Sequence, residues 1–236
     1  MIGPLLRPFA HYLSDFIVKL PTGMICPVIC LLALFPLVLL AEEKPAADQN
    51  TKSLFDGKTT KGWKLTKFGG DGKVAVENGE LILGMGEPLT GVTIADGKGL
   101  PTDNFEIHLD AKRVMGEDFF CGLTFPCHDG HCSLICGGWG GGVVGISSFN
   151  GMDASENETT KYMKFESNKW YHVRVRVAEG KLQTWIDDKP MADVELKGKK
   201  IDTRIEVDVS KPLGIATYRT KAALKNIELR KIVEKK

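Results

Sequence analysis

The stretch Phe105-Glu-Ile-His-Leu-Asp110 decides the fold class, because apolar and polar side chains alternate strictly along it. A second stretch, Tyr171-His-Val-Arg-Val-Arg-Val177, repeats the alternation, with valines on one phase and His172, Arg174 and Arg176 on the other. Successive side chains of a strand point to opposite faces of its sheet. Both stretches therefore predict half-buried β-strands.

Further short segments carry the same period or a brief apolar run, namely 62–67, 73–77, 80–83, 119–125, 131–136, 143–149, 181–187, 192–196, 213–218 and 224–232. Turn dipeptides separate many of them, including Asn78-Gly79, Asp129-Gly130, Glu179-Gly180 and Asp187-Asp188. No long helical stripe intervenes between these segments. The pattern predicts an all-β fold, an antiparallel β-sandwich of the jelly-roll type.

The N-terminal part of the chain reads as an export signal. Arg7 and Lys19 precede an apolar run from Met24 to Leu40, and a polar segment follows Ala41. We expect residues 1–41 to be a signal peptide, with an uncleaved membrane anchor as the alternative, which would be the chain's one contact with a membrane. Residues 42–52 read as a disordered tether and 53–236 as the sandwich domain. The protein is then periplasmic, bound to the cell envelope or secreted.

Charge and motifs narrow the function classes. Lysine and arginine number 31 against 30 aspartates and glutamates, so no net field favours nucleic acid, and a neutral partner is expected. No nucleophile elbow, HExxH zinc motif or phosphate-binding loop occurs in the sequence. The sequence therefore predicts no cofactor.

Four cysteines follow the leader, at positions Cys121, Cys127, Cys132 and Cys136. If Asp129-Gly130 forms the tip of a hairpin, Cys127 faces Cys132 across the two strands. In an oxidising compartment we expect these two to form a disulfide, with the outer two cysteines bridged or simply buried. A zinc site and free buried thiols are the alternatives.

The glycine run Gly137-Gly-Trp-Gly-Gly-Gly142 has two interpretations. Trp139 could lie flat as a platform for the apolar face of a sugar ring. It could instead pack on the sandwich, with the glycines allowing strands to cross closely.

The segment from Asp153 to Thr160 gathers several carboxylates close in sequence. They could supply an acid and a base to a glycosidic bond, or ligands to calcium. A solvated loop built from Asx-turns is the alternative. His172 and Arg174, on the polar phase of their strand, would line a sugar groove if that face of the sheet is the concave one.

The sequence resembles a known family at several places. Leu54-Phe-Asp-Gly-Lys58 followed by Gly62-Trp63 is similar to the opening signature of the bacterial 3-keto-disaccharide hydrolases, and the stretches around Asn78-Gly79 and Pro212-Leu-Gly-Ile-Ala216 fit the same family. The resemblance spans Ser53 to about Lys231, while the centre of the chain departs from the family pattern. It implies a concanavalin A-like sandwich and a carbohydrate partner.

The resemblance also implies an activity, the cleavage of a glycosidic bond in a sugar oxidised at C3. The C3 ketone acidifies the proton on C2, so a carboxylate or a histidine can drive elimination. The candidate acid and base residues are Asp153, Glu156 and His131, and Trp139 is the candidate sugar platform. A noncatalytic glycan-binding module and a structural protein of the cell envelope are the alternatives.

Overall fold

The computed structural model describes residues 50–233, which form two antiparallel sheets stacked as a sandwich. Sheet A consists, in spatial order, of β13 (Lys189–Glu195), β12 (Lys181–Ile186), β11 (Tyr171–Ala178), β6 (Phe105–Gly116), β15 (Thr220–Lys231), β4 (Glu80–Leu83) and β3 (Val74–Glu77), with β1 (Thr51–Ser53) also paired to β15. Sheet B consists of β10 (Lys161–Tyr162), β9 (Val143–Ser147), β8 (Gly130–Gly137), β7 (Cys121–Cys127), β14 (Gly214–Tyr218), β5 (Leu89–Ile94) and β2 (Trp63–Leu65).

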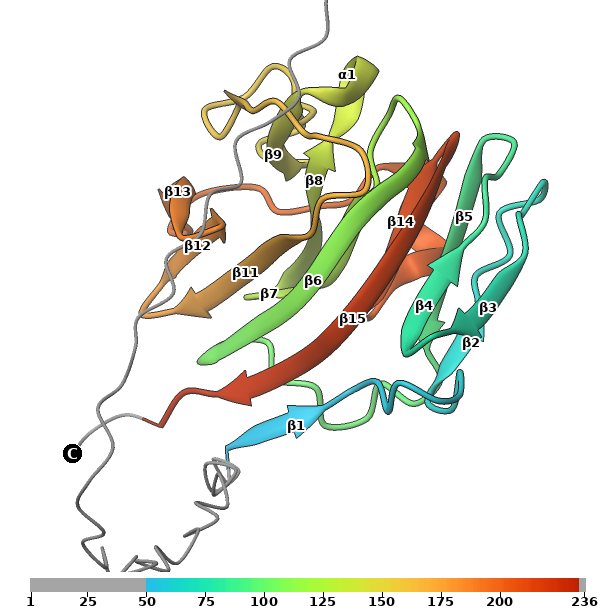
Figure 1. The fold of residues 1–236 in the computed structure, drawn as a ribbon. Coiled ribbons are helices and arrows are strands. Elements are labelled where there is room, and N and C mark those ends of the chain that lie inside the picture. The colour runs from blue at the N-terminus through green and yellow to red at the C-terminus, as the bar shows by residue number, and fades with distance from the viewer. Residues whose placement is uncertain (1–49, 234–236) are drawn as a thin grey trace, which may run out of the picture. The chain divides into compact units, whose positions relative to one another are not determined.

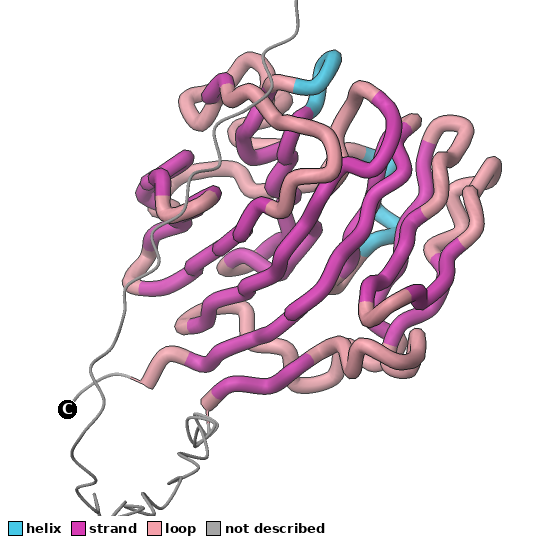
Figure 2. Tube along the Cα trace, in the orientation of Figure 1, coloured by secondary structure: helices cyan, strands magenta, loops and turns pink. Residues whose placement is uncertain are grey.

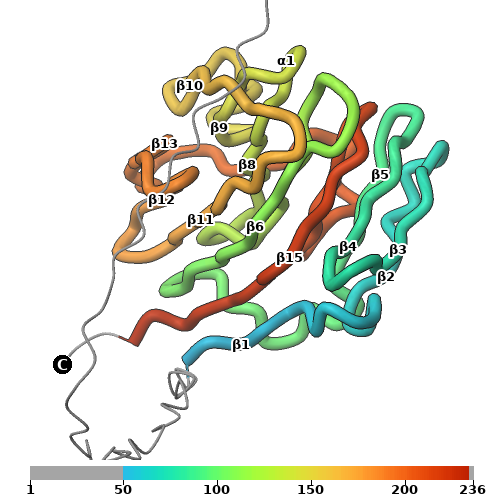
Figure 3. Tube along the Cα trace, in the orientation of Figure 1, coloured from blue at the N-terminus to red at the C-terminus, as the bar shows by residue number. Residues whose placement is uncertain are grey.

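Strands dominate the described chain, and the two helical segments are short (Figure 2). They are the turn α1 (Gly138–Gly141) and the 3-10 helix η1 (Ile205–Ser210). Strands β6 and β15 lie side by side at the centre of sheet A although about a hundred residues separate them in the chain (Figure 3). The predicted antiparallel β-sandwich is confirmed.

The core lies between the two sheets and follows the alternation seen in the sequence. Phe105, Ile107 and Leu109 of β6 are fully buried, as are the valines of β11. They face inward residues of sheet B such as Leu123. Burying each such side chain contributes about 1.5–3 kcal/mol, so the apolar phase of the central strands fixes which face of sheet A points inward.

Two-residue turns close three of the predicted hairpins. Asn78-Gly79, Glu179-Gly180 and Asp187-Asp188 each have positive φ at both positions, and each joins strands whose flanking residues are paired in register. Positive φ at both central residues matches the right-handed twist of the strands, which is why such dipeptides mark hairpins.

The register predicted for the β7–β8 hairpin is wrong. Cys127 pairs with Gly130 rather than with Cys132, so the turn is His128-Asp129, one residue earlier than predicted. Gly130 is required for a different reason: a Cβ there would come within 2.8 Å of the backbone oxygen of Ile201. The glycine permits close approach of another segment and does not form the turn.

The shifted register changes the environment of the cysteines. Phe125 is the direct partner of Cys132, and Cys121 is that of Cys136. The predicted Cys127–Cys132 disulfide is not seen: all four cysteines among residues 50–233 are free, buried thiols. Burial and a contact with Cys127 raise the pKa of the Cys132 thiol, and a contact with Cys121 together with burial raises that of Cys136. Buried thiols of raised pKa are poor nucleophiles.

The boundaries of the domain differ slightly from the prediction. The predicted signal peptide and most of the predicted tether lie outside the described residues, whereas β1 begins at Thr51 and pairs with β15. Strand β5, which was not predicted, contains Gly91, and a Cβ at that position would come within 2.7 Å of the backbone of Ile215. Within residues 50–233, no helix is long and apolar enough to cross a membrane.

Candidate functional site

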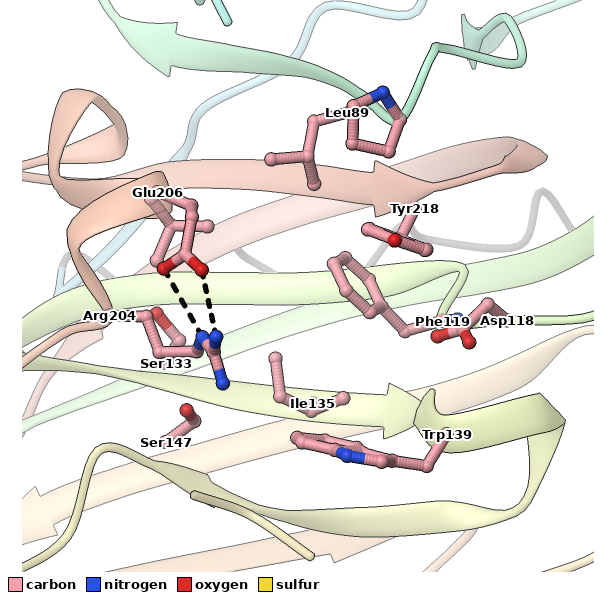
Figure 4. A pocket seen from close by; sticks show the side chains of 12 residues that line it. Leu89, Asp118, Phe119, Ser133, Ile135, Trp139, Ser147, Arg204, Glu206 and Tyr218 are labelled. Carbon is pink, nitrogen blue, oxygen red and sulfur yellow. Dashed lines mark hydrogen bonds and ion pairs between the residues drawn. The ribbon is translucent and has the colours of Figure 1, made fainter. Parts of the chain in front are cut away.

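A groove of about 420 Å³ lies on the outer face of sheet B. Figure 4 shows aromatic side chains toward one end of it and an arginine–glutamate pair toward the other. The aromatic end is formed by Phe119, Trp139 and Tyr218, the polar end by Arg204 and Glu206, and the remaining walls by Pro88, Leu89, Asp118, Ser133, Ile135, Ser147 and Val207. Its size falls within the range of small-molecule sites, roughly 300–1,000 Å³.

Trp139 reaches the groove from α1, which is a left-handed turn rather than a regular helix. Its φ is 50° and that of Gly140 is 81°. The indole is 46% exposed, so it is not buried in the sandwich. Nearby, the rings of Phe119 and Tyr218 lie 5.9 Å apart and continue the apolar wall. The Trp139 side chain is therefore open to solvent at the groove.

The guanidinium of Arg113 holds this turn by hydrogen bonds to its backbone. Arg113 belongs to β6 of sheet A, is only 6% exposed, and donates hydrogen bonds to the backbone oxygens of Gly137 at 3.3 Å and Gly141 at 3.1 Å. A Cβ at position 137 would lie 2.5 Å from its Nη2 atom, so this position requires glycine. Burial lowers the pKa of Arg113, and Asp118 partly counters that shift.

A carboxylate fixes the turn from the other side. Asp118 accepts a hydrogen bond from the backbone N–H of Gly140 at 3.1 Å and another from that of Phe119 at 2.7 Å. Together, Asp118 and Arg113 hold both the donors and the acceptors of the turn. The backbone turn that carries Trp139 is therefore held by one side chain from β6 and one from the loop that follows this strand.

Arg204 organises the polar end of the groove. Its Nη2 atom lies 2.8 Å from Oε1 of Glu206, its Nε atom lies 3.2 Å from Oε2, and its Nη1 atom makes an ion pair with Asp153. The hydrogen bonds from Arg204 lower the pKa of Glu206, and the same contacts raise the pKa of Arg204. The groove therefore presents a cation whose direction is fixed by two carboxylates.

The acidic segment around Asp153 is an ordered loop held by Asn157. The Asn157 side-chain amide donates to the backbone oxygens of Ile146 at 2.7 Å, Met152 at 3.1 Å and Asp153 at 2.7 Å, and its oxygen accepts from Thr159. This agrees with the loop interpretation. Within the described chain, no group of three His, Cys, Asp or Glu side chains is arranged to hold a metal.

The predicted acid and base residues are not gathered in the groove. Asp153 reaches its polar end through Arg204, whereas Glu156 is exposed to solvent. His131 follows the outward phase of Ser133 on β8, but it does not line the groove. Burial and the nearby charge of Lys211 lower the pKa of His131.

Two of the predicted substrate-binding residues lie on the other sheet. His172 and Arg174 project from β11 on the outer face of sheet A, where Arg174 lies 3.9 Å from the ring centre of Trp185. The structure therefore separates them from Trp139, which lines the groove on sheet B.

The polar end of the groove could not be found from sequence motifs. Arg204 and Glu206 come from the segment between β13 and β14, where the sequence shows no motif and the structure forms η1. Phe119 and Tyr218 lie 99 positions apart in the chain and meet because β14 pairs with β7. Tyr218 is the last residue of β14, and Phe119 lies in the loop two residues before β7.

Comparisons with known proteins identify a family from the sequence and a sandwich fold from the structure. Residues 50–230 match the model of the 3-keto-alpha-glucoside-1,2-lyase-like domain. No curated protein matches the chain by sequence. Among solved structures, a Bacillus subtilis protein of unknown function with a galectin-like fold has a TM-score of 0.50 at 12% identity, covering 78% of this chain and 96% of that one.

Two further structures are similar at lower scores. A putative glycosyl hydrolase from Parabacteroides distasonis has a TM-score of 0.48 at 14% identity, covering 78% of this chain and 94% of that one. A carbohydrate-binding module from Bacillus subtilis has a TM-score of 0.47 at 14% identity, with coverage of 72% and 95%. At these identities the similarity concerns the fold alone.

Proposed function

The chain belongs to the 3-keto-alpha-glucoside-1,2-lyase-like domain family, and from this premise we propose that the groove on sheet B binds a glycoside oxidised at C3 and cleaves it by elimination. The observation that carries the proposal is the groove itself, in which an exposed indole and an oriented guanidinium line one cavity. These are the two kinds of group that a keto-sugar needs, an apolar platform and a donor for its carbonyl oxygen.

Each end of the groove takes one part of the ligand. The C–H groups of a sugar ring meet the negative face of the Trp139 indole. Arg204 donates to the C3 carbonyl oxygen, because its guanidinium is fixed in direction by Glu206 and Asp153. The same guanidinium stabilises the negative charge that develops on this oxygen during the reaction.

The reaction is an elimination across C1 and C2 of the sugar. A base removes the proton from C2, and the C–H electron pair becomes part of an enolate whose charge rests on the C3 oxygen. The enolate then re-forms the ketone, a C1–C2 double bond appears, and the bond from C1 to the glycosidic oxygen breaks. The leaving group keeps that electron pair and takes a proton from solvent, and later addition of water across C1 and C2 completes hydrolysis.

Glu206 is the proposed base. Its lowered pKa keeps it ionised at neutral pH, so it can accept a proton. A carboxylate of low pKa is a weak base, but polarisation of the ketone by Arg204 acidifies the C2 proton and offsets this weakness. Asp153 acts through Arg204 and is a positioning residue, while Glu156 and His131 lie outside the groove and take no part.

A noncatalytic glycan-binding role is the second candidate. The lowered pKa of Glu206 is the opposite of what a general acid requires, since such an acid must hold its proton near neutral pH. A groove that only binds sugar needs the indole and the guanidinium but no proton donor whose pKa lies near neutral pH.

In either role we propose that the protein is exported, on the basis of the apolar leader at residues 24–40.

The test compares p-nitrophenyl 3-keto-α-glucoside with the unoxidised p-nitrophenyl α-glucoside, using the purified full chain. We expect nitrophenol release from the keto-sugar alone, its loss in Glu206→Gln, and its retention in the matched control Glu156→Gln. Binding without turnover would favour the noncatalytic role. If the protein neither binds nor cleaves the keto-sugar, the carbohydrate assignment of the groove is refuted.

A further inference from the structure

A second cluster of chemically active side chains lies on the outer face of sheet A, the sheet opposite the one that carries the groove. It consists of Glu106, His108 and Asp110 of β6 with His172 of β11. The Nε2 atom of His108 lies 2.9 Å from Glu106, and the Nδ1 atom of His172 lies 2.9 Å from Asp110. The remaining ring nitrogens, His108 Nδ1 and His172 Nε2, face each other at 3.4 Å.

The two carboxylates determine which ring nitrogens carry protons. At neutral pH a carboxylate only accepts hydrogen bonds, so each imidazole directs an N–H toward its own carboxylate. Asn226 donates to the second oxygen of Asp110 at 2.7 Å and holds that carboxylate in place. In the neutral histidines the two facing nitrogens then both present lone pairs, and a cation between them would satisfy both.

The separation of these nitrogens fits a metal ion. Two ligands at the Zn–N bond length of about 2.0–2.1 Å, at a tetrahedral angle, lie roughly 3.4 Å apart. The same distance also allows one imidazole to donate a hydrogen bond to the other, so the metal and a shared proton compete for these two nitrogens. Histidine ligands commonly donate their other N–H to a carboxylate, as His108 does to Glu106 and His172 to Asp110.

We propose that His108 and His172 form a two-ligand chelate for a divalent transition-metal ion such as Zn²⁺. Imidazole nitrogen suits Zn²⁺, Ni²⁺ and Cu²⁺, whereas Mg²⁺ and Ca²⁺ prefer oxygen ligands. The side chain of His172 is 45% exposed, so an ion can enter from solvent. No third His, Cys, Asp or Glu among residues 50–233 completes the site, so solvent oxygens fill the other positions.

Charged groups of both signs surround the cluster. Glu106 and Asp110 contribute two negative charges next to the imidazoles, and Glu228 of β15 lies opposite His108 in the strand register. On the neighbouring strands Arg174 lies opposite His108, Arg176 opposite Glu106 and Lys225 opposite Asp110, and the Arg174 guanidinium is directed onto the ring of Trp185. A bound ion would link β6 to β11, the two adjacent central strands of sheet A.

The test is calorimetric titration of the full chain with Zn²⁺. We expect one equivalent to bind, at least a hundredfold weaker binding in His108→Gln and in His172→Gln, and a 10–100-fold loss in Glu106→Gln, the usual effect of removing a carboxylate that orients a ligand. His131→Gln, which removes a histidine from sheet B, is the matched control and should bind as the unmodified chain does.

Two results would overturn the proposal. One is the absence of stoichiometric binding, which would mean that the imidazoles share only a proton. The other is binding that persists in both His108→Gln and His172→Gln, because the ion would then sit elsewhere. The absorption spectrum of the Co²⁺-loaded chain distinguishes ligation by the buried thiols from ligation by the histidines. A spectrum without thiolate-to-cobalt bands supports the imidazole site, and a spectrum that contains these bands contradicts it.

Discussion

Replacing Arg113 by methionine tests how the fold positions Trp139. Methionine keeps an unbranched apolar chain of similar reach through the core but removes the guanidinium. The backbone oxygens of Gly137 and Gly141 then lose the donors that hold them at 3.3 and 3.1 Å. The turn that carries the indole would remain attached mainly through Asp118, which binds the N–H of Gly140.

The expected cost follows from these contacts. Hydrogen bonds to a charged group contribute about 1.5–3 kcal/mol each. Part of this is offset because methionine avoids burying a charge, and the Nε atom of Arg113 has no hydrogen-bond partner among the described residues. We therefore expect the free energy of unfolding to fall by about 2–4 kcal/mol. For a domain of this size the melting temperature changes by roughly 2–4 °C per kcal/mol.

Two assays measure the consequences. Urea unfolding gives the change in stability, and titration with a keto-sugar gives the change in affinity. Lys112→Met is the matched control, because Lys112 is the residue before Arg113 on β6 but faces outward, with its Nζ atom 3.1 Å from Glu80 and 4.4 Å from the ring centre of Trp170. Such surface pairs contribute about 0–1 kcal/mol. The reasoning is refuted if Arg113→Met is as stable as the control and binds the sugar equally well.

Three further predictions concern the same structure. Gly137→Ala should lower both stability and sugar affinity, because its Cβ would clash with Arg113 and φ is +80°; circular dichroism melting and the same titration measure this, and a neutral result would contradict it. Iodoacetamide followed by peptide mass spectrometry should leave Cys132 and Cys136 unlabelled until denaturant is added, and rapid labelling of the native chain would show that these thiols are accessible. The pKa of Glu206 lies below its usual 4.5 in the folded state. Its ion pair should therefore stabilise the fold above about pH 4.5 and lose that effect as the pH falls through the folded-state pKa. Urea unfolding at several pH values should show that the stability difference between the unmodified chain and Glu206→Gln shrinks on acidification, and a difference that grows would contradict this prediction.

Much of the fold could be predicted because it depends on local patterns. The alternation in Phe105–Asp110 requires a strand with one buried face, and dipeptides such as Asn78-Gly79 already have the backbone preference of a hairpin turn. The predicted register of the β7–β8 hairpin was wrong because a glycine is equally suited to a turn and to a close approach of two backbones, and Gly130 has the second role, beside Ile201. Only the tertiary neighbour distinguishes the two cases.

Most of the groove could not be predicted because its parts are far apart in the chain. Arg204 and Tyr218 reach one surface through the pairing of strands in sheet B, which no local pattern determines. Trp139 could be identified because it stands alone within a glycine run. Arg113 did leave a signal, since it is a charged residue on the apolar phase of β6, four positions after Leu109. A charged side chain on the buried face of a strand needs hydrogen-bond partners to offset its loss of hydration, and Arg113 finds them in the backbone of the Trp139 turn.

The most direct test of the account measures where the sugar binds. The probe is the methyl C-glycoside of 3-ketoglucose, which has no leaving group and so reports binding alone, titrated into the full chain, Trp139→Ala and Trp185→Ala. The account predicts about a tenfold loss of affinity or more in Trp139→Ala, equivalent to about 1.4 kcal/mol, and no change in Trp185→Ala, whose indole lies on the outer face of sheet A. Unchanged affinity in Trp139→Ala, or a loss confined to Trp185→Ala, would contradict it.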